Sequence, residues 1–375
     1  MVEGKNDGIF WCKNCLNAST RPRITFDQRG WCNACQWMEE KYTLDWSLRE
    51  KELIDILEKL RSKNGEHDCV VPVSGGKDGS YVAYNLKHKY GMNPLCVTIR
   101  PPLELEIGNK NLTNFQNSGY AHIHITPPYE AMRELNKTGF IEMGFPYYGW
   151  LAAILTALVR ISLQMNVKMI FYGESGEVEY GGSSELKNIA TYDIEYMQRI
   201  YLSGGHEKVL RKSGLSESDL YFFKFPNEKE VKNSNLEFAH WSYFENWNSY
   251  RNYLVAKEFC GLEENKHTNS GTFTNFAQND QALYALHAYM MYLKFGFGRA
   301  TQDAGIEIRR GSMDRDQAIN LVNLYDNVFP MEFLELYCEY YQMSEKEFFD
   351  VLDSWVNKTL FKKDGKFWQP RFTIT

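Results

Sequence analysis

The residues best placed to do chemistry lie between Val70 and Ser80, where a short apolar run ends in the sequence Ser-Gly-Gly-Lys-Asp-Gly-Ser. The β-branched run predicts a buried strand over 69–73, and the apolar pattern that follows predicts a helix ending before Gly91. A strand, a glycine turn and a helix start bring several backbone N–H groups around one point at the positive end of the helix dipole. Such a point favours an anion, and phosphate in particular.

The residue types in this loop suit a phosphate group. Two adjacent glycines let the main chain approach without a Cβ in the way, while Ser74, Ser80 and Lys77 offer hydroxyls and positive charge. The Walker spacing GxxxxGK[ST] is absent. The segment instead resembles the SGGxDS loop of the N-type ATP pyrophosphatases, which cleave ATP to AMP and pyrophosphate. An ordinary glycine turn capped by serine and aspartate is the alternative.

Four cysteines near the N-terminus form a second pattern, C-x2-C, then sixteen residues, then C-x2-C. Two such knuckles place four thiolates at the corners of a tetrahedron, as structural zinc requires, and leave no position open for water. A segment this short buries little core, so the metal would stabilise its fold. Two disulfides or an iron–sulfur cluster are the alternatives. The predicted zinc ligands are Cys12, Cys15, Cys32 and Cys35.

A glycine-rich loop over 173–182 follows a predicted strand over 168–172 and carries three carboxylates, Glu174, Glu177 and Glu179. Because the carboxyl ends of parallel strands meet at one edge of a sheet, this loop should open beside the loop over 74–80. Magnesium prefers carboxylates together with phosphate oxygens, so the acidic loop is a candidate magnesium site. A solvated acidic loop is the alternative.

Four cations gather near two glycine breaks in the last third of the chain, after an apolar helix predicted over 278–295. Pyrophosphate leaving from ATP needs cations to hold its charge, which makes this cluster a candidate for that role. Surface salt bridges are the alternative. The four residues are Lys294, Arg299, Arg309 and Arg310.

Alternating strands and helices are expected to position these loops. This alternation predicts an α/β fold with a doubly wound parallel sheet, whose ligands bind at the carboxyl ends of the strands. Before it, an amphipathic helix over 45–63 is expected to start at Asp45 and to bury a stripe of Leu48, Ile54, Leu57 and Leu60. Besides 69–73 and 168–172, the predicted strands cover 95–99 and 121–125, with helices near 109–118, from 129 and over 147–165.

The chain divides into three predicted regions: a metal-binding module over 1–44, an ATP-binding α/β domain over 45–190, and a mainly helical region over 191–375. The last region is expected to complete the active site and to carry a partner surface. Its final helix should begin with a capping box between Ser344 and Glu347.

Composition fits an enzyme of the cytoplasm. The net charge of −6 argues against a large nucleic-acid surface. Four of the eight cysteines are scattered without a framework spacing, which suits a reducing compartment. No apolar signal core opens the chain, and no apolar run is long enough to span a membrane.

The segments described above occur together and in a fixed order. This set resembles the N-acetyl sugar amidotransferases of bacterial surface-polysaccharide and flagellar glycan pathways, within the PP-loop ATP pyrophosphatase superfamily. The resemblance runs from about residue 9 to about residue 330. It implies an adenine nucleotide alpha hydrolase-like sheet and an N-terminal zinc ribbon. The segments are the double C-x2-C, SGGKDGS at 74–80, FYGESGEVEYGG at 171–182 and KFGFGRATQDAGIEIRRGSMDRDQAI at 294–319.

The resemblance implies an ATP-dependent reaction that forms an acetamidino group on a nucleotide-linked acetamido sugar, in O-antigen or lipopolysaccharide biosynthesis. The amide oxygen attacks the α-phosphorus of ATP, pyrophosphate leaves, and ammonia from a separate glutaminase then displaces AMP. Asp78 and Glu174 would hold Mg²⁺, and Lys77, Lys294 and Arg299 would assist with charge. The phosphates would bind at Ser74, Gly75, Gly76, Lys77, Asp78, Gly79 and Ser80.

A PP-loop enzyme that modifies tRNA, by thiolation or lysidine formation, is the alternative function. Sulfur transfer needs cysteines near the nucleotide, and Cys96 at the end of a predicted strand is the candidate. The acidic composition counts against tRNA. The expected cofactors are therefore ATP, Mg²⁺ and Zn²⁺, the expected partners a sugar nucleotide and a glutaminase, with neither nucleic acid nor membrane insertion.

Overall fold

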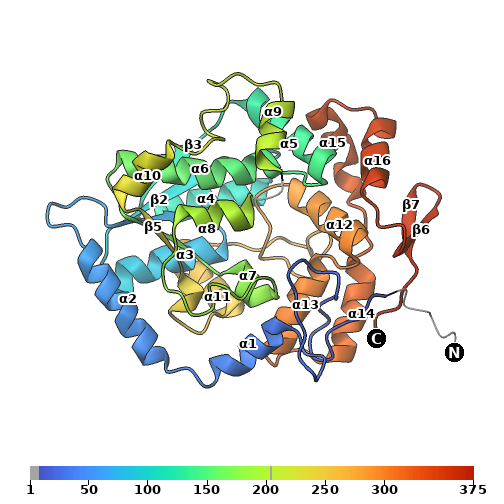
Figure 1. Ribbon diagram of the computed structural model, residues 1–375, viewed down its shortest axis with the longest axis horizontal. Coiled ribbons are helices and arrows are strands. Elements are labelled where there is room, and N and C mark those ends of the chain that lie inside the picture. The colour runs from blue at the N-terminus through green and yellow to red at the C-terminus, as the bar shows by residue number, and fades with distance from the viewer. Residues whose placement is uncertain (1–7, 203–204) are drawn as a thin grey trace.

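A five-stranded parallel sheet forms the centre of the protein, in the order β3-β2-β1-β4-β5 (Figure 1). The computed structural model describes residues 8–202 and 205–375, so residues 1–7 of the predicted metal-binding module lie outside the described residues. The chain adds β2 and β3 at one edge of β1 and then returns to add β4 and β5 at its other edge. The strand order therefore reverses between β1 and β4, which is a topological switch point. The predicted doubly wound sheet is confirmed. The strands are β1 (Cys69–Pro72), β2 (Pro94–Ile99), β3 (Ala121–Ile125), β4 (Met169–Tyr172) and β5 (Glu237–His240).

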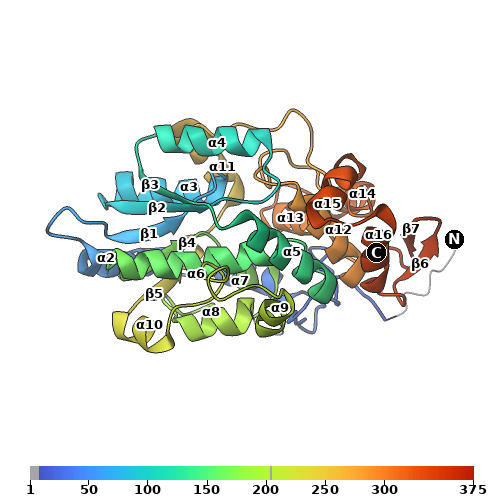
Figure 2. The same ribbon diagram turned by 90° about the horizontal axis from the view of Figure 1, so that it is seen from above.

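Helices cover both faces of this sheet (Figure 2). Successive residues of a strand point to opposite faces, so Val70 packs with helices α5 and α6, whereas Val71 packs with α2, α3 and α4. The helices before the C-terminal third are α1 (Asn33–Lys41), α2 (Trp46–Leu60), α3 (Lys77–Tyr84), η1 (Asn85–Lys89), α4 (Glu106–Asn117), α5 (Tyr129–Met143), α6 (Tyr148–Gln164), α7 (Gly176–Tyr180), α8 (Ile194–Tyr201), α9 (His206–Lys212), α10 (Glu228–Ser234), η2 (Trp241–Tyr243) and α11 (Ser249–Cys260).

Helix α2 lies where the sequence predicts it, but its buried stripe differs. The Asp45 side chain accepts a hydrogen bond from the Ser47 amide, as a cap does. Leu48 is 64% exposed, and the buried face instead runs through Arg49, Leu53 and Leu57. The Arg49 guanidinium stacks 4.1 Å from the Tyr243 ring centroid and donates to the Tyr243 carbonyl. These contacts account for the position of Arg49 on the buried face of the helix. Ile54, also expected in the stripe, is likewise exposed.

A second core lies among the C-terminal helices, which gather at one end of the molecule (Figures 1 and 2). Trp11 and Leu16 of the N-terminal segment belong to the same core, so the two ends of the chain pack together. The predicted capping box between Ser344 and Glu347 is confirmed. The elements here are α12 (Leu283–Phe295), α13 (Arg299–Arg309), α14 (Arg315–Tyr325), η3 (Met331–Phe333), α15 (Leu334–Tyr341), α16 (Glu345–Ser354), β6 (Phe361–Asp364) and β7 (Phe367–Pro370).

The fifth strand lies at Glu237–His240, beyond residue 190, where the sequence division ended the α/β domain. The aromatic stretch before it conceals this strand because its apolar residues show no clear alternation. Among the described residues, no helix is long and apolar enough to cross a membrane.

Candidate functional site

The glycine loop after β1 is shaped by close packing. Gly75 has a φ of +82°, and a Cβ on it would lie 2.5 Å from the Leu112 amide nitrogen in α4. A Cβ on Gly79 would lie 2.5 Å from the Pro72 carbonyl oxygen. The N-cap of α3, Gly76, provides no side-chain acceptor for the first amides of the helix. The start of α3 therefore keeps backbone donors available for an anion.

A cavity of about 290 Å³ opens over this loop and brings three distant segments together. The acidic loop after β4 contributes Glu174, and the start of α13 contributes Arg299. We call this cavity the nucleotide pocket, after the ligand that the sequence predicts for the loop. Its wall contains five of the seven predicted loop residues, namely Ser74, Gly76, Lys77, Asp78 and Gly79.

The other two loop residues lie outside the nucleotide pocket. Gly75 packs against α4 behind the loop, where it allows the approach of the helix backbone. Ser80 is fully buried, and its hydroxyl has no partner. Its carbonyl faces the Cys260 thiol of α11, 4.0 Å away. The first turn of α3 directs the Ser80 side chain into the core. This placement does not agree with the predicted role of its hydroxyl at the phosphates.

Two carboxylates face each other in the nucleotide pocket. Burial and the nearby Glu174 carboxylate raise the pKa of Asp78, although the Lys77 ammonium is paired with it. The Tyr180 hydroxyl donates to Glu174 Oε1 over 2.7 Å. A divalent cation would relieve this repulsion, and Mg²⁺ commonly binds through one or two carboxylates plus phosphate oxygens. Asp78 and Glu174 fit that requirement.

Arg299 enters the same pocket from the N-terminus of α13. Burial alone would lower the pKa of its guanidinium, but Asp303, Tyr180 and Glu174 together raise it, so the positive charge persists. Its Nε donates to Asp303 Oδ1 over 2.8 Å, which fixes the side chain. The buried Asp326 carboxylate accepts from the Gly298 amide over 2.8 Å and so caps the helix start.

The predicted cation cluster is split, and only Arg299 reaches the nucleotide pocket. Lys294 donates to the Met143 carbonyl over 2.8 Å and lies over the Trp355 ring, so the structure does not bring it to the nucleotide pocket with Arg299. Arg309 contacts the cysteines, and Arg310 pairs with Glu307. The reason is helical geometry: Lys294 lies in the last turn of α12, while Arg299 and Arg309 lie at opposite ends of α13.

The acidic loop is also divided between two tasks. Glu177 accepts from Arg23 Nε over 2.8 Å, and Glu179 accepts from Lys41 over 2.6 Å and from the Trp37 indole over 2.9 Å. All three partners belong to the N-terminal module. Of the three carboxylates considered for magnesium, only Glu174 therefore lines the nucleotide pocket.

The four N-terminal cysteines converge on one point. All four are buried and free of disulfides, and their Sγ atoms lie within 4.8 Å of one another. Sγ separations of 3.8 Å (Cys12–Cys35), 3.7 Å (Cys32–Cys35) and 3.6 Å (Cys15–Cys32) match the edge of about 3.8 Å in a tetrahedron with Zn–S bonds of about 2.3 Å. The disulfide alternative is wrong, and the cluster could hold zinc.

One side chain from outside the module and one from within it complete this sulfur cluster. Arg309 Nη1 donates to Cys15 Sγ over 3.1 Å, and Asn17 Nδ2 donates to Cys32 Sγ over 3.4 Å. Asn17 also donates to the Tyr180 carbonyl over 3.0 Å. Such donors orient thiolates and offset their charge. The cluster is therefore joined both to α13 and to the acidic loop.

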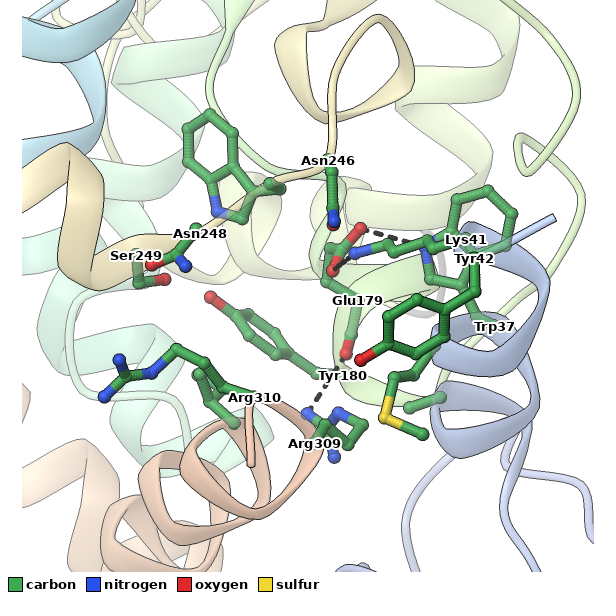
Figure 3. Close-up of a pocket in the computed structure, with 14 residues that line it drawn as sticks. Trp37, Lys41, Tyr42, Glu179, Tyr180, Asn246, Asn248, Ser249, Arg309 and Arg310 are labelled. Atoms are coloured by element: carbon green, nitrogen blue, oxygen red, sulfur yellow. Dashed lines mark hydrogen bonds and ion pairs between the residues drawn. The ribbon is translucent and has the colours of Figure 1, made fainter. Parts of the chain in front are cut away.

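A second cavity, of about 180 Å³, lies between the module and these elements (Figure 3). Figure 3 shows Lys41 and Trp37 pointing to Glu179, while the Tyr180 ring lies between Asn248 and Arg309. We call this the metal-side cavity. Its position shows that Tyr180 contributes to both regions, since its ring lines this cavity and its hydroxyl contacts Glu174.

Several wall residues of the nucleotide pocket escaped the sequence analysis, among them Asn279, Asp280 and Tyr284. Burial raises the pKa of Asp280, and a hydrogen bond from Ser74 offsets part of this rise. Only the polar run that precedes α12 could have indicated them, since it interrupts the apolar pattern of the predicted helix over 278–295. That helix begins at Leu283 instead.

Two parts of the chain are similar to known proteins or families. Residues 270–373 match the family model for the C-terminal domain of WbpG-like lipopolysaccharide biosynthesis proteins. This segment contains Arg299, Asp280 and Tyr284. An uncharacterised protein of Methanocaldococcus jannaschii, MJ1599, is 34% identical over 89 residues. That match covers 24% of this chain and 32% of the archaeal protein, so the chain spans about a third of the length of this relative.

Proposed function

We propose that this protein is an ATP-dependent, AMP-forming amidotransferase that converts the N-acetyl group of a nucleotide-linked sugar to an acetamidine. The observation that carries the proposal is the nucleotide pocket, where an uncapped helix start, two partly buried carboxylates and Arg299 meet at the carboxyl edge of a parallel sheet. The lipopolysaccharide family match over 270–373 supports a sugar acceptor. The likeness of the loop to ATP pyrophosphatases supports ATP as the second substrate.

The reaction needs positioning and charge rather than a protein nucleophile. The amide oxygen attacks the α-phosphorus and pyrophosphate leaves, giving an O-adenylyl imidate. Ammonia adds to the imidate carbon, and AMP departs with the former amide oxygen. The α3 amides and Lys77 bind phosphate oxygens, and Arg299 stabilises the charge that develops on pyrophosphate. Bound at Asp78 and Glu174, Mg²⁺ would neutralise further phosphate charge.

Ammonia is supplied from outside the chain. A glutaminase requires an activated nucleophile, and a cysteine thiol acts as one only when its pKa is low. Burial raises the pKa of Cys260 to about 11, and Cys69 and Cys96 are fully buried with raised pKa values. Cys96 is also absent from the wall of the nucleotide pocket, which weighs against the tRNA-thiolation alternative.

The test is nucleotide product analysis with purified protein, MgCl₂, ATP, ammonium chloride and an N-acetylated sugar nucleotide. We expect AMP and pyrophosphate in step with acetamidino product, at a rate that rises with pH as more ammonia is unprotonated. Glutamine alone should give no product. ADP as the nucleotide product, or AMP formation that depends on tRNA instead of the sugar, would refute the proposal.

A further inference from the structure

A third cavity, of about 640 Å³, adjoins the nucleotide pocket, and Gln278 and Tyr284 line both. Its volume falls in the usual range for a small-molecule site. The start of α4, the loop over 263–270 and the segment over 278–285 form its walls. We call it the acceptor cavity. An acceptor bound there would reach the nucleotide across the shared wall.

Gln281 in this wall has no internal partner. The residue is 1% exposed, and neither its Nε2 nor its Oε1 makes a hydrogen bond. Among the described residues it is the one side-chain amide with both atoms buried and unpaired. An unpaired buried polar group costs about 1–3 kcal/mol, so an amide left in this state points to a ligand.

The backbone at Gln281 is held in place by neighbouring segments. Its backbone forms a bridge with Glu104, and the Ala282 amide donates to the Leu103 carbonyl over 3.0 Å. The neighbouring Tyr284 hydroxyl donates to Asp280 Oδ2 over 3.4 Å and forms no hydrogen bond with the Gln281 amide. The side chain is therefore held beside Tyr284, a residue that borders both cavities.

Nearby asparagines show the opposite condition. Asn265 Nδ2 donates to Asn269 Oδ1 over 3.0 Å, and Asn269 Nδ2 donates to Asn279 Oδ1 over 2.7 Å. Asn275 Nδ2 donates to the Asn265 carbonyl over 2.9 Å. These amides satisfy one another and hold the loop in place. Gln281 alone is left out of the arrangement, so the wall is rigid while one amide stays available.

The charges of the acceptor cavity favour a neutral ligand rich in hydroxyl groups. Two lysines and four carboxylates line it, which disfavours a diphosphate inside and provides acceptors for hydroxyl donors. Lys110 is paired with Glu263 over 2.7 Å. A sugar ring suits this wall, with the diphosphate of a sugar nucleotide directed to the open mouth. The charged residues are Glu106, Lys110, Glu263, Glu264, Lys266 and Glu332.

We infer that Gln281 recognises the 2-acetamido group of the acceptor sugar, and that this contact selects N-acetylated sugars over their hydroxyl counterparts. The amide N–H and the adjacent ring hydroxyl lie on neighbouring carbons, so Oε1 accepts from the N–H while Nε2 donates to the hydroxyl oxygen. The acetyl oxygen, which lies trans to the N–H, then faces the shared wall and the α-phosphorus. This inference rests on the proposed function.

The test is binding of UDP-N-acetylglucosamine and UDP-glucose, measured by calorimetry with ADP and MgCl₂ present, in the wild type and in Gln281→Met. We expect the wild type to prefer the acetamido compound at least about tenfold, the discrimination that a paired polar group provides. Gln281→Met should bind both alike and should unfold at an equal or higher temperature, because an unpaired buried amide is removed. Gln281→Glu, which keeps an acceptor, should retain part of the preference.

Gln116→Met is the matched control. Its amide is hydrogen-bonded to His122 Nδ1 over 3.1 Å, outside both cavities, so this variant should keep the preference and lose stability. Binding of neither compound by the wild type, an unchanged preference in Gln281→Met, or a weakened affinity for the adenine nucleotide instead would overturn the inference. Wild-type AMP formation, assayed separately, decides the proposed function: acetamidine turnover that is unaffected by Gln281→Met would refute the inference alone.

Discussion

The metal-side cavity and the nucleotide pocket flank the same acidic loop but differ in how their charges are compensated. On the metal side, Lys41 pairs with Glu179 and Arg309 pairs with the sulfur cluster. In the nucleotide pocket, three carboxylates (Asp78, Glu174 and Asp280) share the wall with two cations, Lys77 and Arg299, and Arg299 is already paired with Asp303. A cavity with compensated charges is typical of a structural junction, whereas an excess of partly buried carboxylates is typical of a site that binds a cation.

Helix α13 joins the two regions, with Arg299 at its first residue and Arg309 at its last. One helix thus places one cation at each site. The two arginines carry the same charge and belong to one predicted cluster, so charge alone does not separate a residue of the pocket from a structural residue. Their partners distinguish them.

The largest effect is expected from removing a metal ligand. Cys12→Ser should abolish binding of about one zinc per chain, because three thiolates leave the tetrahedron open. Elemental analysis gives the stoichiometry, and limited proteolysis should show earlier cleavage in the first 44 residues than in the sheet. A fully folded, metal-free wild-type protein would contradict the structural assignment of this cluster.

The next effect compares two glutamates five residues apart on one loop. Glu174→Gln should lower AMP-forming turnover about 100-fold, the scale on which single preorganised electrostatic groups act, with little change in melting temperature. Raising MgCl₂ should restore part of the loss if Glu174 holds the cation. Turnover close to that of the wild type at low magnesium would remove Glu174 from the site.

Glu179→Gln is the counterpart on the metal side. Its carboxylate forms an ion pair with Lys41, and both side chains are nearly buried, at 11% and 10% exposure. Breaking one half of such a pair should lower the free energy of unfolding by about 3 kcal/mol. Thermal denaturation should detect this loss, while turnover per folded molecule stays within a few-fold of the wild type. A large loss of turnover with unchanged stability would show that Glu179 acts at the reaction site and has no structural role.

The smallest effect concerns the helix that links the sites. Burial raises the pKa of Asp326 to about 6, against the usual value near 4, and the hydrogen bonds from Thr301 and Gly298 only partly offset this. A raised pKa in the folded state means that protonation favours folding. This contribution is present below pH 4 and is lost as pH rises through 6.

The corresponding variant is Asp326→Asn. Between pH 4 and pH 7 the wild type should lose about 2 kcal/mol of stability relative to Asp326→Asn, as measured by urea denaturation at each pH. Parallel pH profiles of the two proteins would show that Asp326 does not titrate in this range.

Four of the five strands followed from sequence because a doubly wound sheet alternates with helices at regular spacing, whereas β5 and the order of the strands did not. The strand over 121–125 agrees residue for residue, and the phosphate loop lies where a loop after β1 must lie. Contacts between distant segments did not follow. Glu177 and Arg309 look like site residues in the sequence, and only the packing of the N-terminal module shows that they anchor it.

Gln281 could not be predicted for a related reason. A glutamine in a polar loop is ordinary, and what makes it informative is the absence of a partner in the folded chain. The positive φ of +58° at Gln278, in the wall between the two cavities, is equally invisible in a sequence. An unpaired amide becomes visible only in the folded chain, where the hydrogen-bond partners of the other polar groups are known.

The contact between Arg309 and Cys15, separated by 294 residues, has a consequence for biosynthesis. The cysteine knuckles leave the ribosome long before the arginine that supports them is made. During that interval the knuckles have neither Arg309 nor the acidic loop to pack against. Early zinc capture would keep four thiols from oxidation until those parts emerge, so the yield of active protein should depend on zinc supply during translation more than afterwards.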